Sequence, residues 1–135
     1  MSAITVTAAQ VAELYPFKEI YSLEAAEAIT KGQAVYVNSN GKAALADASA
    51  AGTLNLVAIA LNSVGAGQPV SVLKAGFVAG ATLTGLAYGD PVYVSDTAGG
   101  LDTAAGTVSK VIGRVAPVNR AGNIQKALYI QSDWN

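Results

Sequence analysis

The chain has 135 residues with no cysteine and no histidine, and eight Lys and Arg against nine Asp and Glu give it a formal net charge of −1. Zinc sites built on thiolates or imidazoles, and catalysis by cysteine or histidine, are therefore excluded, and without a basic cluster we expect no direct nucleic-acid partner. The length suits a single domain that folds without disulfides or metals.

The first 24 residues differ in composition from the rest, because all four glutamates of the chain lie within or just after them. They include LYPFKEIY at 14–21, where apolar side chains crowd a segment in which Pro16 opposes a continuous helix. We expect an extended N-terminal arm over residues 1–24 that packs on the domain or on a partner. SLEAAEA at 22–28 allows either a short helix capped by Ser22 or the continuation of a strand.

A strand-like phrase then recurs along the chain. GQAVYV at 32–37 returns as GDPVYV at 89–94, with a looser copy, GQPVSV, at 67–72. Alternation around valine is the period of a β-strand, and the leading glycine predicts a turn. Similar turns and strands follow both outer copies in the same order. Residues 32–76 and 89–132 are therefore predicted to be two versions of one unit.

Short strands separated by Gly, Asn, Asp and Ser turns predict an all-β fold. We expect a small antiparallel barrel or β-clip-like domain over residues 25–135, built from the two duplicated β-units, with the N-terminal arm extending from it. The uncharged stretch 48–73 is interrupted by polar residues, and its longest apolar run, LVAIAL at 56–61, is strand-sized. It is too short to cross a bilayer, so we expect no membrane partner.

Candidate ligand-binding patterns are weak. GAGQP at 65–69 is rich in glycine, but no helix pattern follows it to direct a dipole at a phosphate, so a turn is predicted. Asp96 and Asp102 bracket TAGGL without the alternating acidic ligands of a calcium loop, and a solvated turn is predicted there as well. We therefore expect no metal and no cofactor.

Two pairs of residues bring a serine close to a lysine in the sequence, Ser109 with Lys110 and Ser71 with Lys74. A serine nucleophile can be activated by a neighbouring base. Adjacent strand residues face opposite ways, however, and neither pair has a third group to orient it. We expect no enzymatic activity.

Four segments together resemble the capsid decoration, or cement, proteins of tailed bacteriophages. They are AxxITKGQAVYV, GKAALADAS, NLVAIALNSVxAGQPVSV and GDPVYVSDTAG, and the resemblance covers roughly residues 25–115. It rests on a β-framework phrase and not on a catalytic signature, so it identifies a family and not individual site residues.

The resemblance implies a small β-rich protein made in the host bacterial cytoplasm and bound to the outside of an expanded icosahedral head in the virion. Members often sit as homotrimers at threefold and quasi-threefold positions and clamp neighbouring major capsid protein subunits together. A chain that lacks thiol and imidazole groups and carries little charge suits a role in which the protein acts by binding other proteins and not by catalysis.

The arm is the predicted capsid contact because it carries a dense apolar group. Its contact residues are expected to be Leu14, Tyr15, Pro16, Phe17, Ile20 and Tyr21. Two alternatives stay open. Another phage structural β-protein, such as a tail or head-completion subunit, would form rings or tubes. A carbohydrate- or surface-binding β-module would need an exposed aromatic platform, which the single tryptophan, Trp134, supports poorly.

Overall fold

A computed structural model describes residues 3–11, 13–120 and 122–132, without the side chains of 13–18 and Arg120. Strands make up 47% of the chain and helices 5%. The predicted all-β fold is therefore confirmed. No helix within the described ranges is long and apolar enough to cross a membrane.

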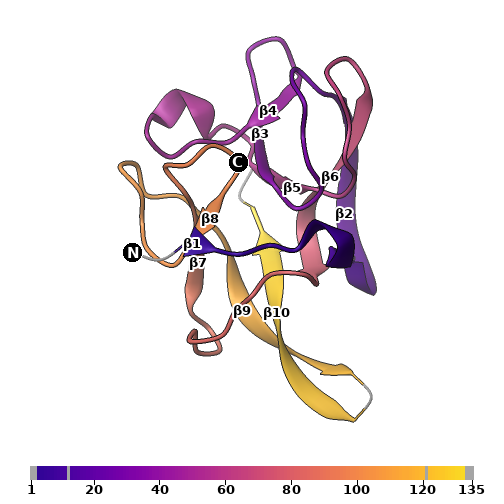
Figure 1. Ribbon diagram of the computed structural model, residues 1–135, viewed down its shortest axis with the longest axis vertical. Helices are drawn as coiled ribbons and strands as arrows, with labels where there is room; N and C mark the ends of the chain where they lie inside the picture. The colour runs from indigo at the N-terminus through magenta and orange to yellow at the C-terminus, as the bar shows by residue number, and fades with distance from the viewer. Residues whose placement is uncertain (1–2, 12, 121, 133–135) are drawn as a thin grey trace.

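Ten strands form one antiparallel sheet in the described part of the chain (Figure 1). The strands are β1 Ala3–Ile4, β2 Glu13–Glu24, β3 Ala34–Val37, β4 Ala43–Leu45, β5 Ala58–Ala60, β6 Pro69–Val78, β7 Pro91–Val94, β8 Leu101–Asp102, β9 Val111–Arg120 and β10 Asn123–Gln131, with short 3-10 helices η1 at Ala8–Gln10 and η2 at Ala51–Thr53. Their order is β1-β8-β7-β9-β10-β6-β5-β3-β4, with β2 pairing only with β6. The end strands do not pair with each other over the described residues, so the expected barrel is not closed.

The two predicted units have the same strand pairing. In each unit the first strand pairs with the second and the third, and the third pairs with the fourth: β3 with β4 and β5 and β5 with β6, then β7 with β8 and β9 and β9 with β10. The last strands, β6 and β10, pair antiparallel and join the units. The duplication predicted from the phrase thus extends to the hydrogen-bonded topology.

Hydrogen bonds outside the ladders repeat as well. The N–H of Gly32 donates to the Ala60 carbonyl at 2.8 Å, and the N–H of Gly89 donates to the Val115 carbonyl at 2.8 Å. The return bonds, from Ala60 to Gln33 and from Val115 to Asp90, are each 2.9 Å long. Each glycine of the phrase therefore fastens the turn before the first strand to the third strand of its own unit.

The units are nevertheless packed differently. Val92 pairs with Gly113 and faces the main core, whereas the matching Val35 pairs with Ala58 and faces a second, smaller cluster. The difference arises from a β-bulge in β6. The consecutive β2 residues Glu19 and Ile20 pair with Ala75 and Leu73, so Lys74 between them is an extra residue without a register partner on β2. An extra residue of this kind turns the following side chains to the other face of the sheet. The unit at residues 32–76, here called unit 1, thus turns the opposite face to the main core from the unit at residues 89–132, here called unit 2.

The main core lies between the two units and is closed by the N-terminal segment. It contains Leu73 of unit 1, Val78 at the end of β6, and Val92 and Leu128 of unit 2, all at most 2% exposed. The second cluster includes Val35, Val70 and Val72 of unit 1 and is covered by Ala25 and Ile29. A covered face on each side of unit 1 explains its many small buried residues.

Residues 3–11 run across the molecule from β1 toward β2 in Figure 1. Ile4 is 8% exposed and Val11 is 1% exposed, and both belong to the main core. The Thr7 N–H donates to the Gly80 carbonyl at 2.8 Å. The first part of the expected arm therefore lies against the domain. The division into an arm at residues 1–24 and a β-domain at residues 25–135 that folds without it stays a prediction.

Candidate interaction surfaces

The repeated phrase begins with the same turn three times, at residues 30–33, 65–68 and 87–90. In each turn the N–H of the fourth residue donates to the carbonyl of the first, at 3.0, 3.2 and 3.1 Å. A side-chain oxygen of the fourth residue, Gln33, Gln68 or Asp90, accepts from the N–H of the first at 2.8 Å. The third residue is a glycine with φ of 94°, 84° or 90°. The repetition thus encodes a turn that starts a strand.

The glycine of the first turn is also tightly packed. A Cβ at Gly32 would lie 2.6 Å from Cγ1 of Val6 and 3.0 Å from Cγ2 of Val11, whereas a Cβ at Gly89 would meet nothing within 4 Å. Gly32→Ala should therefore lower the free energy of unfolding by about 2–4 kcal/mol, through both backbone strain and overpacking. Gly89→Ala, the matched control, should lower it by only about 1 kcal/mol, since only the strain remains. Urea unfolding of the two variants measures the difference; equal losses would contradict the packing.

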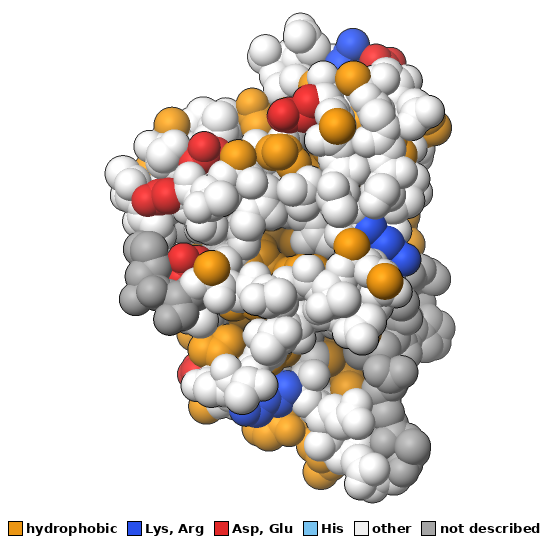
Figure 2. Space-filling model, viewed as in Figure 1, with side chains coloured by type: hydrophobic (Ala, Val, Ile, Leu, Met, Phe, Trp, Pro, Cys, Tyr) orange, Lys and Arg blue, Asp and Glu red, His pale blue; other side chains and the backbone are white. Residues whose placement is uncertain are grey.

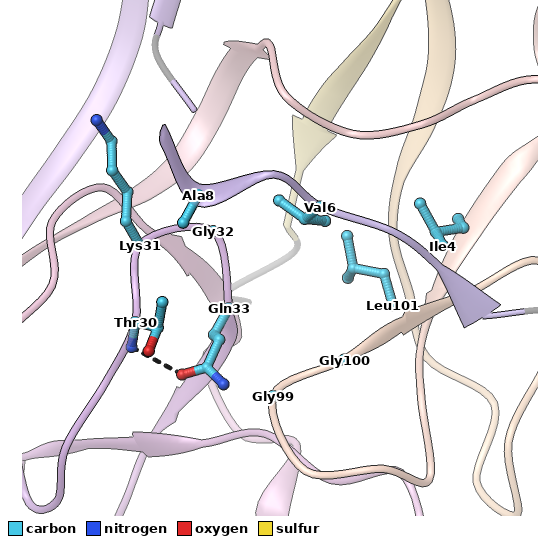
Figure 3. A pocket seen from close by; sticks show the side chains of 10 residues that line it. All are labelled: Ile4, Val6, Ala8, Thr30, Lys31, Gly32, Gln33, Gly99, Gly100 and Leu101. Carbon is cyan, nitrogen blue, oxygen red and sulfur yellow. Dashed lines mark hydrogen bonds between the residues drawn. The ribbon is translucent and has the colours of Figure 1, made fainter. Parts of the chain in front are cut away.

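A cavity of about 270 Å³ lies beside this turn (Figure 3). It is bounded by the N-terminal segment on one side and by the 30–33 turn and residues 99–101 on the other. Its lining contains one charged residue, Lys31, whose side chain points away from the other side chains drawn. The lining has no carboxylate to act as an acid or base. We interpret this cavity as the seam where the N-terminal segment closes over the core.

The two predicted turn aspartates have different hydrogen-bond partners. Both carboxylate oxygens of Asp96 accept from Thr107, from its N–H at 2.9 Å and from its hydroxyl at 3.0 Å. Asp102 is 5% exposed, and its Oδ1 accepts from the Ala104 N–H at 3.2 Å. Over the residues that the structure describes, no group of three or more His, Cys, Asp or Glu side chains could hold a metal ion. Asp96 therefore ties the loop after β7 to the loop after β8. Asp102 caps the turn that follows β8 but is buried, so the predicted solvated turn is wrong for this residue.

The serine and lysine pairs have separate contacts. The ammonium of Lys74 lies 3.3 Å from the Glu19 carboxylate. The N–H of Ser71 donates to Oδ1 of Asn62 at 2.8 Å. Lys110 contributes its carbonyl to the Val94 N–H at 3.0 Å. None of these contacts joins a serine hydroxyl to a lysine.

The predicted capsid-contact residues all fall on β2, the strand outside the main strand order. The side chains of Leu14, Tyr15, Pro16 and Phe17 lie outside the described residues. Ile20 is 39% exposed and Tyr21 is 49% exposed. They pair with Leu73 and Val72 of β6 as consecutive residues, so their side chains point to opposite faces. Both predicted contact residues whose side chains are described are therefore exposed. They lie on a strand that pairs with β6 along one edge and with no other strand of the described chain along the other.

A second exposed surface was missed by the sequence analysis. The β9–β10 hairpin projects beyond the rest of the molecule in Figure 1, and residues 122–126, here called the hairpin tip, are all exposed. Ile124 is 70% exposed, the highest value among the large hydrophobic residues described. The ammonium of Lys126 lies 5.8 Å from the centre of the Tyr88 ring, which is itself 49% exposed.

The hairpin tip borders an open groove of about 590 Å³, called here the tip groove. Its lining combines hydroxyl, amide, aromatic, aliphatic and ammonium groups, from Thr82, Thr84, Tyr88, Ile124, Gln125 and Lys126. A signal was available in the sequence, because the run NIQK places one isoleucine among polar residues next to a turn. A single isoleucine in a strand pattern does not reveal which of its faces is left uncovered.

Among the described residues, the carboxylates have partners within the chain, whereas three lysines form no ion pair. Each described carboxylate has a partner within the chain: Glu19 with Lys74, Glu24 with Lys42, and Glu27, Asp47, Asp90, Asp96 and Asp102 with backbone N–H groups. Hydrogen bonds from the Ser49 hydroxyl and N–H hold the pKa of Asp47 below its usual value of 3.8. In contrast, Lys31, Lys110 and Lys126 have no ion pair within the described chain.

The face in Figure 2 carries few charged side chains, scattered among uncharged atoms and apolar groups. Such a surface favours contact with other proteins more than with a polyanion. No protein-family model matches the chain, and no curated protein matches it significantly.

Proposed function

We propose that this chain is a non-enzymatic capsid decoration protein, which binds the outside of an expanded phage head and stabilises contacts between major capsid protein subunits. The observation that carries the proposal is the resemblance of residues 25–115 to that family, centred on the GQAVYV and GDPVYV phrases. The duplicated topology supports it, since each phrase begins the first strand of one unit.

The geometry suits a clamp. The two units share one core and one continuous sheet, so forces applied at opposite ends are carried through packed strands. The exposed surfaces on β2 and on the hairpin tip belong to different parts of this sheet. A rigid body with two separate contact surfaces can hold two neighbouring subunits at a fixed spacing.

Stabilisation follows from where the protein binds. Sites present only on the assembled, expanded shell favour that state by mass action, and bridging subunits raises the barrier to local opening. We propose a homotrimer in the virion, in which the charge-poor faces supply the contacts between copies. No cofactor, metal, membrane or nucleic acid takes part.

Heads that lack the protein should assemble but release their genome at lower temperature, and adding the purified protein back should restore the resistance without covalent change. The measurement is genome release on heating, followed by a DNA-binding dye, for depleted and replenished heads. Replenishment with heat-denatured protein is the control. Identical release curves for depleted and replenished heads would reject the cement role, and assembly of the protein into rings or tubes would favour a tail or head-completion subunit.

A further inference from the structure

The hairpin tip is built as a projecting contact element. Five consecutive exposed residues extend past the core, and the backbone behind them is held by ladder pairs to β9, including Ala127 with Ala116 and Leu128 with Val115. Further down the same hairpin, Leu128 and Ile130 are buried in the main core. The tip is therefore anchored by a buried base while its own apolar side chain is left uncovered.

The exposed aliphatic group is unlike the other surface side chains. Ile124 is 70% exposed, and it presents this aliphatic surface to the tip groove and not to open solvent on its own. It lies in the same groove as Tyr88 and Lys126, and isoleucine, tyrosine and lysine together offer an apolar wedge, a flat ring and a cation. Burial of such a wedge at the centre of an interface is a common source of affinity.

The charges around the tip groove indicate the chemistry of the partner. No carboxylate lines the groove, and Lys126 has no ion pair within the described chain. The guanidinium of Arg114 donates to the Gly89 carbonyl at 3.0 Å and places a second cation beside the 87–90 turn. The nearest turn acid, Asp90, is bonded to the Ala87 N–H at 2.8 Å. The surface is thus complementary to carboxylates beside an apolar recess.

We infer that the hairpin tip and the tip groove form a docking surface for an acidic patch on the outer face of the major capsid protein, with Ile124 entering an apolar recess and Lys126 facing carboxylates. This inference rests on the proposed function. It assigns a shell contact to a part of the chain other than β2. With only two cations the surface offers little to a nucleic acid, whose binding requires several phosphate contacts.

The test is co-sedimentation of the purified full-length protein with heads prepared without it. Ile124→Ser should weaken binding about 10- to 100-fold, as expected for removing a buried aliphatic anchor. Lys126→Glu should weaken it by a similar factor and reduce its dependence on salt, because a favourable charge contact becomes repulsive. Both positions are exposed, so the melting temperature should change little.

Lys110→Glu and Leu56→Ser are the matched controls, with comparable changes at a lysine that has no ion pair in the described chain and at an exposed aliphatic residue, both outside the lining of the tip groove. They should bind within about twofold of the unchanged protein. Normal binding by both tip variants, or equal loss in tip and control variants, would overturn the docking surface and leave the decoration function standing. Failure of the unchanged protein to bind heads would overturn both. Sedimentation with anionic lipid vesicles in place of heads would assign the tip to a lipid surface instead.

Discussion

Deletion of residues 1–11 should lower the free energy of unfolding by about 3–6 kcal/mol, because Ile4 and Val11 leave the main core and each buried side chain of this size contributes about 1.5–3 kcal/mol. The loss is a large share of the roughly 5–15 kcal/mol that stabilises a typical domain. Backbone bonds are lost too, such as that from the Thr82 N–H to the Thr5 carbonyl at 2.7 Å.

Urea unfolding followed by circular dichroism measures this loss. Ala9→Ser is the control, since Ala9 is exposed on η1 and the change should stay within about 0.5 kcal/mol. Val11→Ala alone should cost about 1–2 kcal/mol and locate the effect in the core. An unchanged urea midpoint in the deletion would mean that the segment is dispensable for folding, and the expectation of a separable arm over residues 1–24 would then gain support.

Gly113→Ala should be the most damaging single substitution considered, with a loss of about 3 kcal/mol or more in the free energy of unfolding. An added Cβ would clash with the Tyr129 carbonyl oxygen of the paired strand β10. Backbone cannot move aside as a flexible side chain can. Gly113 pairs with Val92, next to a register shift in the pairing of β7 with β9, and a glycine in a strand is typical of such a close approach.

Gly52→Ala is the matched control for Gly113→Ala, because a Cβ there would meet nothing within 4 Å and its φ is not in the left-handed range. It should change the stability by less than about 1 kcal/mol, in either direction. Differential scanning calorimetry of both variants makes the comparison. If the Gly113→Ala and Gly52→Ala proteins had the same melting temperature, β9 and β10 would not be packed as closely as described.

The sequence predicted the strands and the duplication because both depend on local patterns. Alternation around Val35 and Val92 has a period that only a strand satisfies, and the glycine at the start of each phrase needs the left-handed backbone that Gly32 and Gly89 adopt. The extra residue Lys74 in β6 could not be predicted, since it is defined by pairing with a distant strand. That one residue decides which face of unit 1 enters the main core.

Exposed apolar side chains were predicted less completely than the strands. Counting apolar residues directed attention to Tyr15 and Phe17, whose side chains lie outside the described residues, and to Ile20 and Tyr21, which are exposed. The same counting overlooked Ile124, because exposure depends on how far the hairpin extends past the core and not on local composition. The buried positions of Ile4 and Val11 also depend on long-range packing.

Electron cryomicroscopy of heads with and without the protein tests the decoration function most directly. We expect added density on the outer surface of the shell, grouped in threes between major capsid protein subunits, into which this fold fits with the β9–β10 hairpin directed at the shell. Heads that look the same with and without the protein, or density confined to the neck or tail, would contradict it.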